Sequence, residues 1–193
     1  MKRVCVFCGS STGARPEYLQ AAHETGIALA ERGLGLVYGG AQIGLMGELA
    51  NVVLERGGEV IGVMPEALVA REISHTTLTE LRIVSSMHER KNLMSELADA
   101  FITLPGGYGT FDEFCEILTW AQLGLHRKPC GVLNVCGYYD RLLSFFDYAV
   151  EEQFIASSNR NLVLEAVDPR ALLEKFERFQ PMQRTKWITK AET

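Results

Sequence analysis

Short apolar runs alternate with helical patterns along almost the whole chain, and this alternation strongly limits the possible folds. The run Val4-Cys5-Val6-Phe7 is apolar at every position, as expected for a parallel strand covered by helices on both faces. The pattern therefore predicts an α/β chain with a doubly wound, mainly parallel sheet and helices on both faces. The predicted strands are Arg3–Cys8, Leu34–Tyr38, Glu59–Met64, Leu81–Val84, Ala100–Leu104, Cys130–Val135 and Leu162–Ala166. The predicted helices are Pro16–Arg32, Leu45–Glu55, Met87–Leu97, Thr110–Leu123, Tyr138–Glu152 and Pro169–Phe179.

The composition is that of an ordinary globular domain. The chain has 193 residues, 47% hydrophobic and 22% charged, which predicts one well-buried domain over residues 1–180 and a tail at 181–193. Its formal net charge is −5 with scattered Lys and Arg, which argues against a nucleic-acid surface. No run is long enough to span a membrane, and five cysteines do not suggest a disulfide framework, so we expect a cytoplasmic protein.

Glycine-rich segments follow three of the predicted strands. In doubly wound sheets, ligands bind beyond the carboxyl ends of the strands, where the winding reverses. We therefore expect the three segments to line one crevice, with Ser10, Gly39 and Gly40 among its ligand contacts. The segments are Gly9–Gly13, Gly39–Gly44 and Gly106–Gly109.

The segment Pro105–Glu113 carries the strongest functional signal. It follows the apolar run Ala100–Leu104 and opens a helix, where glycines let a ligand approach the unpaired N–H groups of the first turn. This arrangement suits a phosphate, with Glu113 one turn further on, near the attached sugar or base. Thr110 and Glu113 also fit a capping box, which local pattern alone favours. The match to a dinucleotide fingerprint is poor, and a Walker motif is absent.

A second candidate cluster opens the predicted helix Met87–Leu97. Ser86 and Glu89 have the spacing of another capping box, and Arg90 and Lys91 interrupt the apolar stripe of the helix. A cation on an inward face is costly unless it is paired, although both side chains can instead extend into water. An adjacent arginine and lysine beside a glycine crevice fit anion binding better, because arginine grips a phosphate through two parallel hydrogen bonds.

Other chemistries have weaker signals. Cys5 and Cys8 form a C-x-x-C pattern, but Cys5 falls inside a predicted strand, so we interpret both as buried core thiols. A serine-nucleophile elbow is absent, and none of the four histidines has metal-ligand spacing with a cysteine or another histidine. We therefore expect neither a metal nor a cofactor.

The two motifs Pro105–Glu113 and Met87–Lys91 together resemble those of the Lonely Guy (LOG) family, and the likeness extends from Val4 to about Leu164. LOG proteins are cytokinin riboside 5′-monophosphate phosphoribohydrolases, long mislabelled as lysine decarboxylases. The resemblance implies a Rossmann-like fold, usually as a homodimer with the active site near the subunit contact.

The resemblance also implies a reaction and a set of site residues. The expected reaction is hydrolysis of the N-glycosidic bond of a nucleoside 5′-monophosphate, AMP or N6-modified AMP, to the free base and ribose 5-phosphate. Arg90 and Glu113 match the catalytic residues of the family. The substrate contacts that it implies are Glu72, Lys91, Gly106, Gly107, Tyr108, Gly109, Thr110 and Thr119.

This reaction would explain why a glutamate is needed at position 113. Cleavage of the C–N bond develops positive charge on the ribose, so Glu113 is expected to stabilise it and to orient or deprotonate water. Arg90 would bind the phosphate or assist the departing base. Two other interpretations stay open: a non-catalytic nucleotide or cofactor carrier of the same fold, and a pyridoxal-dependent decarboxylase, which needs a Schiff-base lysine and a larger fold. The apolar helices Phe111–Leu125 and Tyr138–Phe154 are candidates for the dimer contact.

Overall fold

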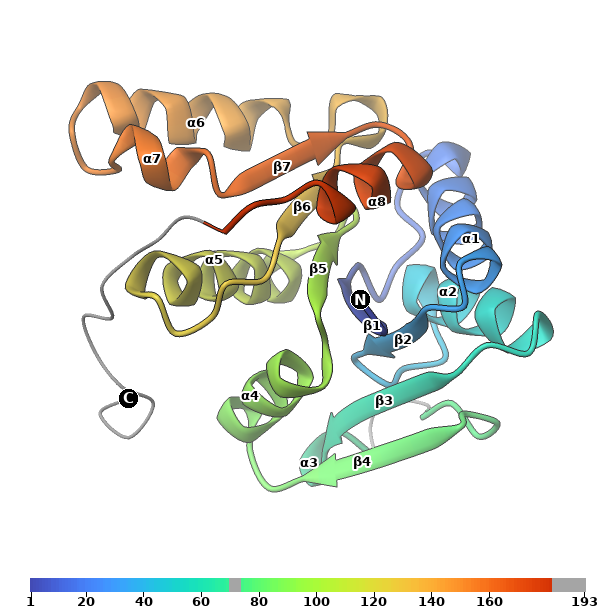
Figure 1. Ribbon diagram of the computed structural model, residues 1–193. Helices are drawn as coiled ribbons and strands as arrows, with labels where there is room; N and C mark the ends of the chain where they lie inside the picture. Colours follow the sequence, from blue (N-terminus) through green and yellow to red (C-terminus); the bar gives the residue numbers. More distant parts are fainter. Residues whose placement is uncertain (70–73, 182–193) are drawn as a thin grey trace.

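All strands of the central sheet run parallel. The computed structural model describes residues 1–69 and 74–181, and these form a seven-stranded sheet in the order β4-β3-β2-β1-β5-β6-β7 (Figure 1). Each neighbouring pair is parallel, which confirms the predicted fold class. The strands are β1 Arg3–Phe7, β2 Gly35–Tyr38, β3 Val60–Pro65, β4 Glu80–Val84, β5 Ala100–Thr103, β6 Cys130–Leu133 and β7 Val163–Ala166.

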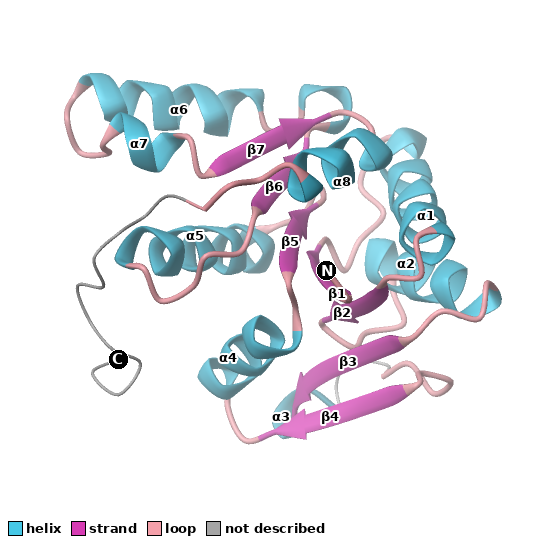
Figure 2. Ribbon diagram, in the orientation of Figure 1, coloured by secondary structure: helices cyan, strands magenta, loops and turns pink. Residues whose placement is uncertain are grey.

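Helices cover both faces of this sheet. Figures 1 and 2 show α1 and α2 on the opposite side of the central strands from α4 and α5. The first face is covered by α1 Pro16–Glu31, α2 Gly44–Glu55 and α8 Pro169–Glu177. The second face is covered by α4 Met87–Leu97, α5 Tyr108–Leu123 and α6 Asp140–Glu151.

Alternate residues of β1 explain why the helices must lie on both sides. Val4 and Val6 join the hydrophobic core under α1, α2 and α8, whereas Cys5 and Phe7 join the core under α4 and α5. Successive side chains of a strand point to opposite faces, so a strand apolar at every position needs two covers. Burial raises the pKa of the Cys5 thiol well above its usual value, as expected for an unreactive core cysteine.

The winding of the sheet reverses between β1 and β5. β1 and β5 are neighbours in the sheet, but the connection after β1 leads through α1 to β2 on one side, and the connection after β5 leads through α5 to β6 on the other. At the carboxyl end of β1 the Gly9 N–H donates to the Pro105 carbonyl at 3.0 Å. A Cβ on Gly9 would lie 3.3 Å from the Gly106 Cα, so the two glycine loops are in contact. This is the position where doubly wound sheets bind ligands.

Several boundaries differ from the predictions. Helix α5 begins at Tyr108, two residues before the predicted start. Helix α6 (Asp140–Glu151) begins two residues after the predicted start at Tyr138, and a 3₁₀ turn at Val135–Gly137 precedes it. The one-turn helices α3 (Glu66–Val69) and α7 (Ser157–Arg160) were not predicted, because a single turn is too short to show a periodic stripe.

Two predictions concern residues outside the described part of the chain. Glu72 lies in the segment 70–73, and the predicted tail lies almost wholly in 182–193. Within residues 1–69 and 74–181, none of the helices combines the length and the apolar character needed to cross a membrane.

Candidate active site

The glycine loops after β1 and β2 meet at the carboxyl edge of the sheet. The Gly9 carbonyl accepts a hydrogen bond from the Leu45 N–H at 3.1 Å, which ties the loop after β1 to the start of α2. Gly44 has φ +60°, and a Cβ there would lie 2.3 Å from the Ser10 carbonyl carbon, so only glycine allows this approach. Gly40 also has a left-handed backbone, with φ +84°. Ser10, Gly39 and Gly40 therefore lie in neighbouring loops, and their contact with a ligand stays a prediction.

Arg90 reaches from the first turns of α4 into the interior beneath these loops. Its side chain is only 10% exposed, and Nε donates to the Val63 carbonyl at 3.0 Å. Nη2 donates to the Gly39 carbonyl at 3.3 Å. The Val63 carbonyl lies within β3 and the Gly39 carbonyl directly follows β2, so backbone groups compensate part of the cost of burying the guanidinium.

The remaining end of the guanidinium faces Glu113. Arg90 Nη1 lies 3.5 Å from Glu113 Oε1, and the Glu113 side chain is 11% exposed. The two motifs, far apart in the sequence, therefore come together, and they do so through a buried ion pair that the sequence did not predict. Their part in catalysis stays a prediction at this point.

The environment of Glu113 changes its acidity. Burial raises the pKa of Glu113 from 4.5 to about 7, the charges of Arg90 and Lys91 oppose this rise, and Asp112 and Glu116 add to it. A carboxyl group that titrates near neutral pH can serve in proton transfer, and strongly shifted values concentrate at functional sites.

The capping-box interpretation of Thr110 and Glu113 is wrong. The N-cap of α5 is Gly107, and it makes no side-chain capping bond. Thr110 is buried inside the first turn with its Oγ1 against Gly106, where a Cβ would come within 2.1 Å of that oxygen. The Glu113 carboxylate is therefore not engaged in a cap. The Ser86 cap, by contrast, is present: Ser86 Oγ accepts from the Glu89 N–H at 3.1 Å.

The start of α5 is open toward solvent. A Cβ on Gly107 or Gly109 would meet no atom within 4 Å, and Tyr108 between them is 93% exposed. The first N–H groups of a helix carry a partial positive charge, and here no acidic side chain in the first turn neutralises it. This helix end is therefore suited to bind an anion.

Lys91 also contacts α5, where its charge is already paired with two acidic side chains. Its Nζ donates to Asp112 Oδ2 at 3.1 Å and to Glu116 Oε1 at 3.0 Å. Sequence reasoning missed both acids, although their spacing of four residues on α5 is the available signal. Direct contact of Lys91 with a phosphate would require it to exchange one of these carboxylates.

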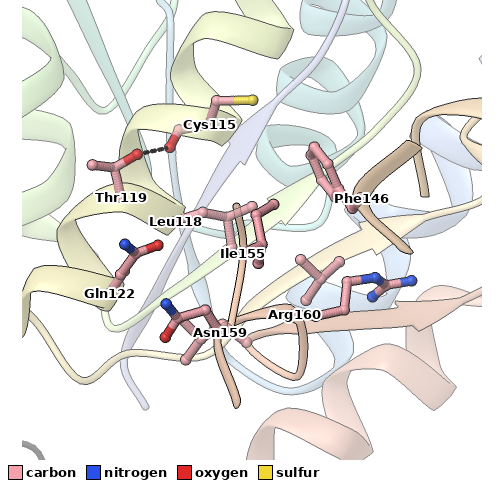
Figure 3. Close-up of a pocket in the computed structure, with 10 residues that line it drawn as sticks. Cys115, Leu118, Thr119, Gln122, Phe146, Ile155, Asn159 and Arg160 are labelled. Carbon is pink, nitrogen blue, oxygen red and sulfur yellow. Dashed lines mark hydrogen bonds between the residues drawn. The ribbon is translucent and has the colours of Figure 1, made fainter. Parts of the chain in front are cut away.

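Thr119 lies apart from the Arg90–Glu113 pair. Its hydroxyl donates to the Cys115 carbonyl at 2.8 Å, and it lines a cavity of about 170 Å³ between α5, α6 and α7 (Figure 3). The walls of this cavity are largely apolar and include Leu118, Phe146 and Ile155. The structure therefore does not bring Thr119 together with the other predicted site residues.

Comparison with known proteins identifies the family. A family model described as "Possible lysine decarboxylase" matches residues 46–176. The chain is 52% identical over 180 residues to cytokinin riboside 5′-monophosphate phosphoribohydrolase LOG of Oryza sativa subsp. japonica. The aligned part covers 93% of this chain and 74% of that protein. The corresponding protein LOG7 of Arabidopsis thaliana is 50% identical over 180 residues, covering 93% of this chain and 83% of its own. The chain belongs to the LOG family. The resemblance noted from the two motifs is thereby confirmed.

Solved structures support the fold of this LOG-family chain. The molybdenum cofactor carrier protein of Chlamydomonas reinhardtii superposes with a TM-score of 0.70 at 22% identity, covering 92% of this chain and 99% of that chain. The molybdenum cofactor binding protein of Rippkaea orientalis gives 0.69 at 22% identity, covering 92% and 97%. At this identity the likeness concerns the Rossmann-like fold alone.

The decarboxylase named in the family description does not fit the lysine present at this site. A Schiff base forms on a neutral amine, which requires a lysine with a lowered pKa. Burial acts to lower the pKa of Lys91, but the hydrogen bonds that it donates to Glu116 and Asp112, and the charges of these carboxylates, outweigh burial, so the pKa of Lys91 is raised. A protonated lysine held by two carboxylates is not a nucleophile. In the described part of the chain, no group of His, Cys, Asp and Glu is arranged to hold a metal ion.

Replacing Gly39 tests how Arg90 is positioned. A Cβ at this position would lie 2.2 Å from Arg90 Nη2, so Gly39→Ala should displace the guanidinium from Glu113. Because the charge of Arg90 opposes the rise in the pKa of Glu113, this pKa should move above about 7. A carbon-13 NMR titration of the glutamate carboxyl groups measures the shift.

Gly131→Ala is the matched control. Its Cβ would lie 2.7 Å from Leu172 Cδ1, a similar clash placed in the core under α8. We expect it to lower stability by roughly 1–3 kcal/mol without changing the titration of Glu113. An unshifted Glu113 in Gly39→Ala would show that Gly39 does not determine the position of Arg90.

Proposed function

We propose that this LOG-family protein hydrolyses the N-glycosidic bond of a nucleoside 5′-monophosphate and releases the free base and ribose 5-phosphate. The observation that carries the proposal is the buried Arg90–Glu113 pair, 3.5 Å apart, next to the open start of α5. The names of relatives about 50% identical over most of the chain specify a riboside 5′-monophosphate as their substrate. We therefore assign AMP or an N6-modified AMP as the substrate.

Water is the only co-reactant that this reaction needs. The C–N bond between ribose C1′ and the base breaks with its electron pair moving to the base nitrogen, and C1′ gains positive charge. The oxygen of water bonds to C1′, and a proton from water ends on the base. A carboxylate beside C1′ stabilises the developing charge and can accept the proton of the attacking water. We assign this role to Glu113.

The contacts of Arg90 favour a particular role. Nε and Nη2 are directed to the Val63 and Gly39 carbonyls, and Nη1 is directed to Glu113. In this arrangement the guanidinium orients the carboxylate and opposes the burial that would keep it protonated. We therefore infer that the first role of Arg90 is to orient Glu113 and to favour its ionised form. We also infer that the phosphate binds at the N–H groups at the start of α5.

Glu113→Gln tests the assignment of the carboxylate. The amide keeps the size of the side chain but cannot stabilise positive charge or accept a proton, so kcat for base release from AMP should fall roughly 10²- to 10⁴-fold. The dissociation constant for AMP should stay within about threefold, because phosphate recognition is assigned to α5. Chromatography of the released base and calorimetric titration of AMP measure the two quantities.

Glu174→Gln, an exposed position on α8, is the control and should leave both quantities unchanged. Full turnover in Glu113→Gln would contradict the catalytic assignment. Nucleotide binding without base release by the unmodified protein, from any nucleoside monophosphate, would instead favour a carrier. The same panel with and without N6 substituents identifies the base.

The pH dependence of kcat/KM is a second test. Below about pH 7 Glu113 becomes protonated, so kcat/KM should fall about tenfold per pH unit on the acid side. A carboxyl with a raised pKa stabilises the folded protein fully below its unfolded value of 4.5, and this contribution is lost as the pH rises through about 7. As the pH rises toward about 7, ionisation of Glu113 should therefore increase kcat/KM and lower the free energy of unfolding.

The phosphate of the substrate also titrates, near pH 6, and must be separated from Glu113. Binding of ribose 5-phosphate to Glu113→Gln over the same pH range reports the phosphate alone. A kcat/KM profile that follows this binding curve, with no further loss of activity near pH 7, would contradict the role of Glu113.

We also propose a homodimer formed through α6 and the loop after it. Phe145 and Tyr148 are exposed on α6, and Phe154 in the following loop is 87% exposed, an unusual group of aromatic side chains for a free surface. Light scattering should give twice the chain mass, and the double change Phe145→Glu and Phe154→Glu should give the monomer mass. Val167→Glu, at an exposed position after β7, should leave the dimer intact. A monomeric unmodified protein would refute the dimer.

A cytoplasmic location stays a prediction.

A further inference from the structure

Two consecutive tyrosines after β6 hold the turn that opens α5. The Tyr138 hydroxyl donates to the Gly106 carbonyl at 2.5 Å, and the Tyr139 hydroxyl donates to the Leu104 carbonyl at 2.7 Å. Both carbonyls lie in the turn, more than thirty residues earlier in the chain. The two bonds therefore connect the loop after β6 directly to the candidate phosphate site.

All four carbonyls along this turn are used by the protein. In addition to the two tyrosine bonds, the Pro105 carbonyl accepts from the Gly9 N–H at 3.0 Å, and the Gly107 carbonyl accepts from the Phe111 N–H at 3.1 Å. A trans peptide group is planar, so its N–H points opposite to its carbonyl. Fixing the Gly106 carbonyl toward Tyr138 therefore directs the Gly107 N–H away from it.

The turn is closely packed at one glycine and open at the next. A Cβ at Gly106 would come within 2.1 Å of Thr110 Oγ1 and 2.9 Å of the Gly9 nitrogen, so the chain is tightly packed there. A Cβ at Gly107 would meet nothing within 4 Å, so the next position faces open space. The peptide between them thus has one packed side, with its carbonyl bound, and one open side suited to a ligand.

The ring of Tyr138 is itself fixed by other aromatic rings. It lies edge-on to Tyr18 at 5.6 Å and to Tyr139 at 5.0 Å, and it stacks with Phe111 at 6.5 Å. Tyr139 is anchored in turn, because its N–H donates to Asn134 Oδ1 at 2.8 Å. Such contacts keep the Tyr138 hydroxyl in place without involving the Arg90–Glu113 pair.

We propose that Tyr138 is a positioning residue for anion binding: its hydroxyl fixes the Gly106–Gly107 peptide so that the Gly107 N–H faces the phosphate of the substrate. The proposal deepens the hydrolase function and rests on it for the identity of the ligand. The chemistry at the sugar depends on Glu113, so Tyr138 should influence how tightly the phosphate is held and not how fast the bond breaks.

Tyr138→Phe tests this role, because it removes the hydroxyl and keeps the ring contacts. The dissociation constant for ribose 5-phosphate should rise about five- to tenfold, the effect of one lost hydrogen bond. KM for AMP should rise by a similar factor, with kcat within about twofold. Binding of the free base adenine should not change, because the base does not require this turn. A general loss of structure would instead weaken both ligands and lower kcat.

Tyr18→Phe is the matched control, since it removes a tyrosine hydroxyl and keeps the ring that lies edge-on to Tyr138. It should bind ribose 5-phosphate as the unmodified protein does. If the unmodified protein releases no base but Tyr138→Phe still weakens ribose 5-phosphate binding, the hydrolase function fails and the role of Tyr138 stands. Equal binding of ribose 5-phosphate by the unmodified protein and Tyr138→Phe would overturn the proposal, whatever the activity.

Discussion

The guanidinium of Arg90 is buried, and the surrounding structure is built to accept it. An isolated buried charge is strongly destabilising, so it must be met by acceptors and by an opposite charge. The Gly39 carbonyl directly after β2 and the Val63 carbonyl within β3 are the acceptors, and α5 supplies Glu113. The order of the strands is what brings these groups together, because β2 and β3 lie beside β1 and α5 follows β5 on its other side. A buried ion pair is a poor source of stability, and this supports the chemical role proposed for Arg90 and Glu113.

The same burial that makes Arg90 costly also adjusts Glu113. Burial raises the pKa of this carboxyl and the charge of Arg90 lowers it. The resulting value is about 7, so both the neutral and the ionised forms are populated near neutral pH. A more exposed carboxyl would be ionised but well solvated, and its charge would be screened from the sugar. A buried carboxyl without the arginine would stay neutral. The pair is therefore a compromise that keeps a carboxylate both available and poorly solvated.

The sequence predicts the parts of this arrangement that depend on local pattern. Apolar alternation predicts the sheet, and the glycine segments after the strands predict where the loops converge. The contacts that refine the site are long-range, and their signals are weak: a carbonyl such as that of Val63 has no side-chain signature, and tyrosines after β6 resemble core residues. The pattern of Thr110 and Glu113 was misleading for a physical reason. A glycine N-cap let the helix begin earlier, at Tyr108, which placed Glu113 beyond the first turn and beside Arg90.

In the proposed mechanism, binding and chemistry are supplied by different kinds of groups. The turn that opens α5 is backbone, held by Gly9, Tyr138 and Tyr139, and the start of a helix is suited to an anionic group. The chemistry is assigned to two side chains: the Glu113 carboxylate and Arg90, whose charge lowers the pKa of that carboxylate. This separation explains why the fold alone says little about function, since it recurs at 22% identity in a molybdenum cofactor carrier protein. A chain can keep the backbone turn while changing the pair, and would then bind a ligand without cleaving it.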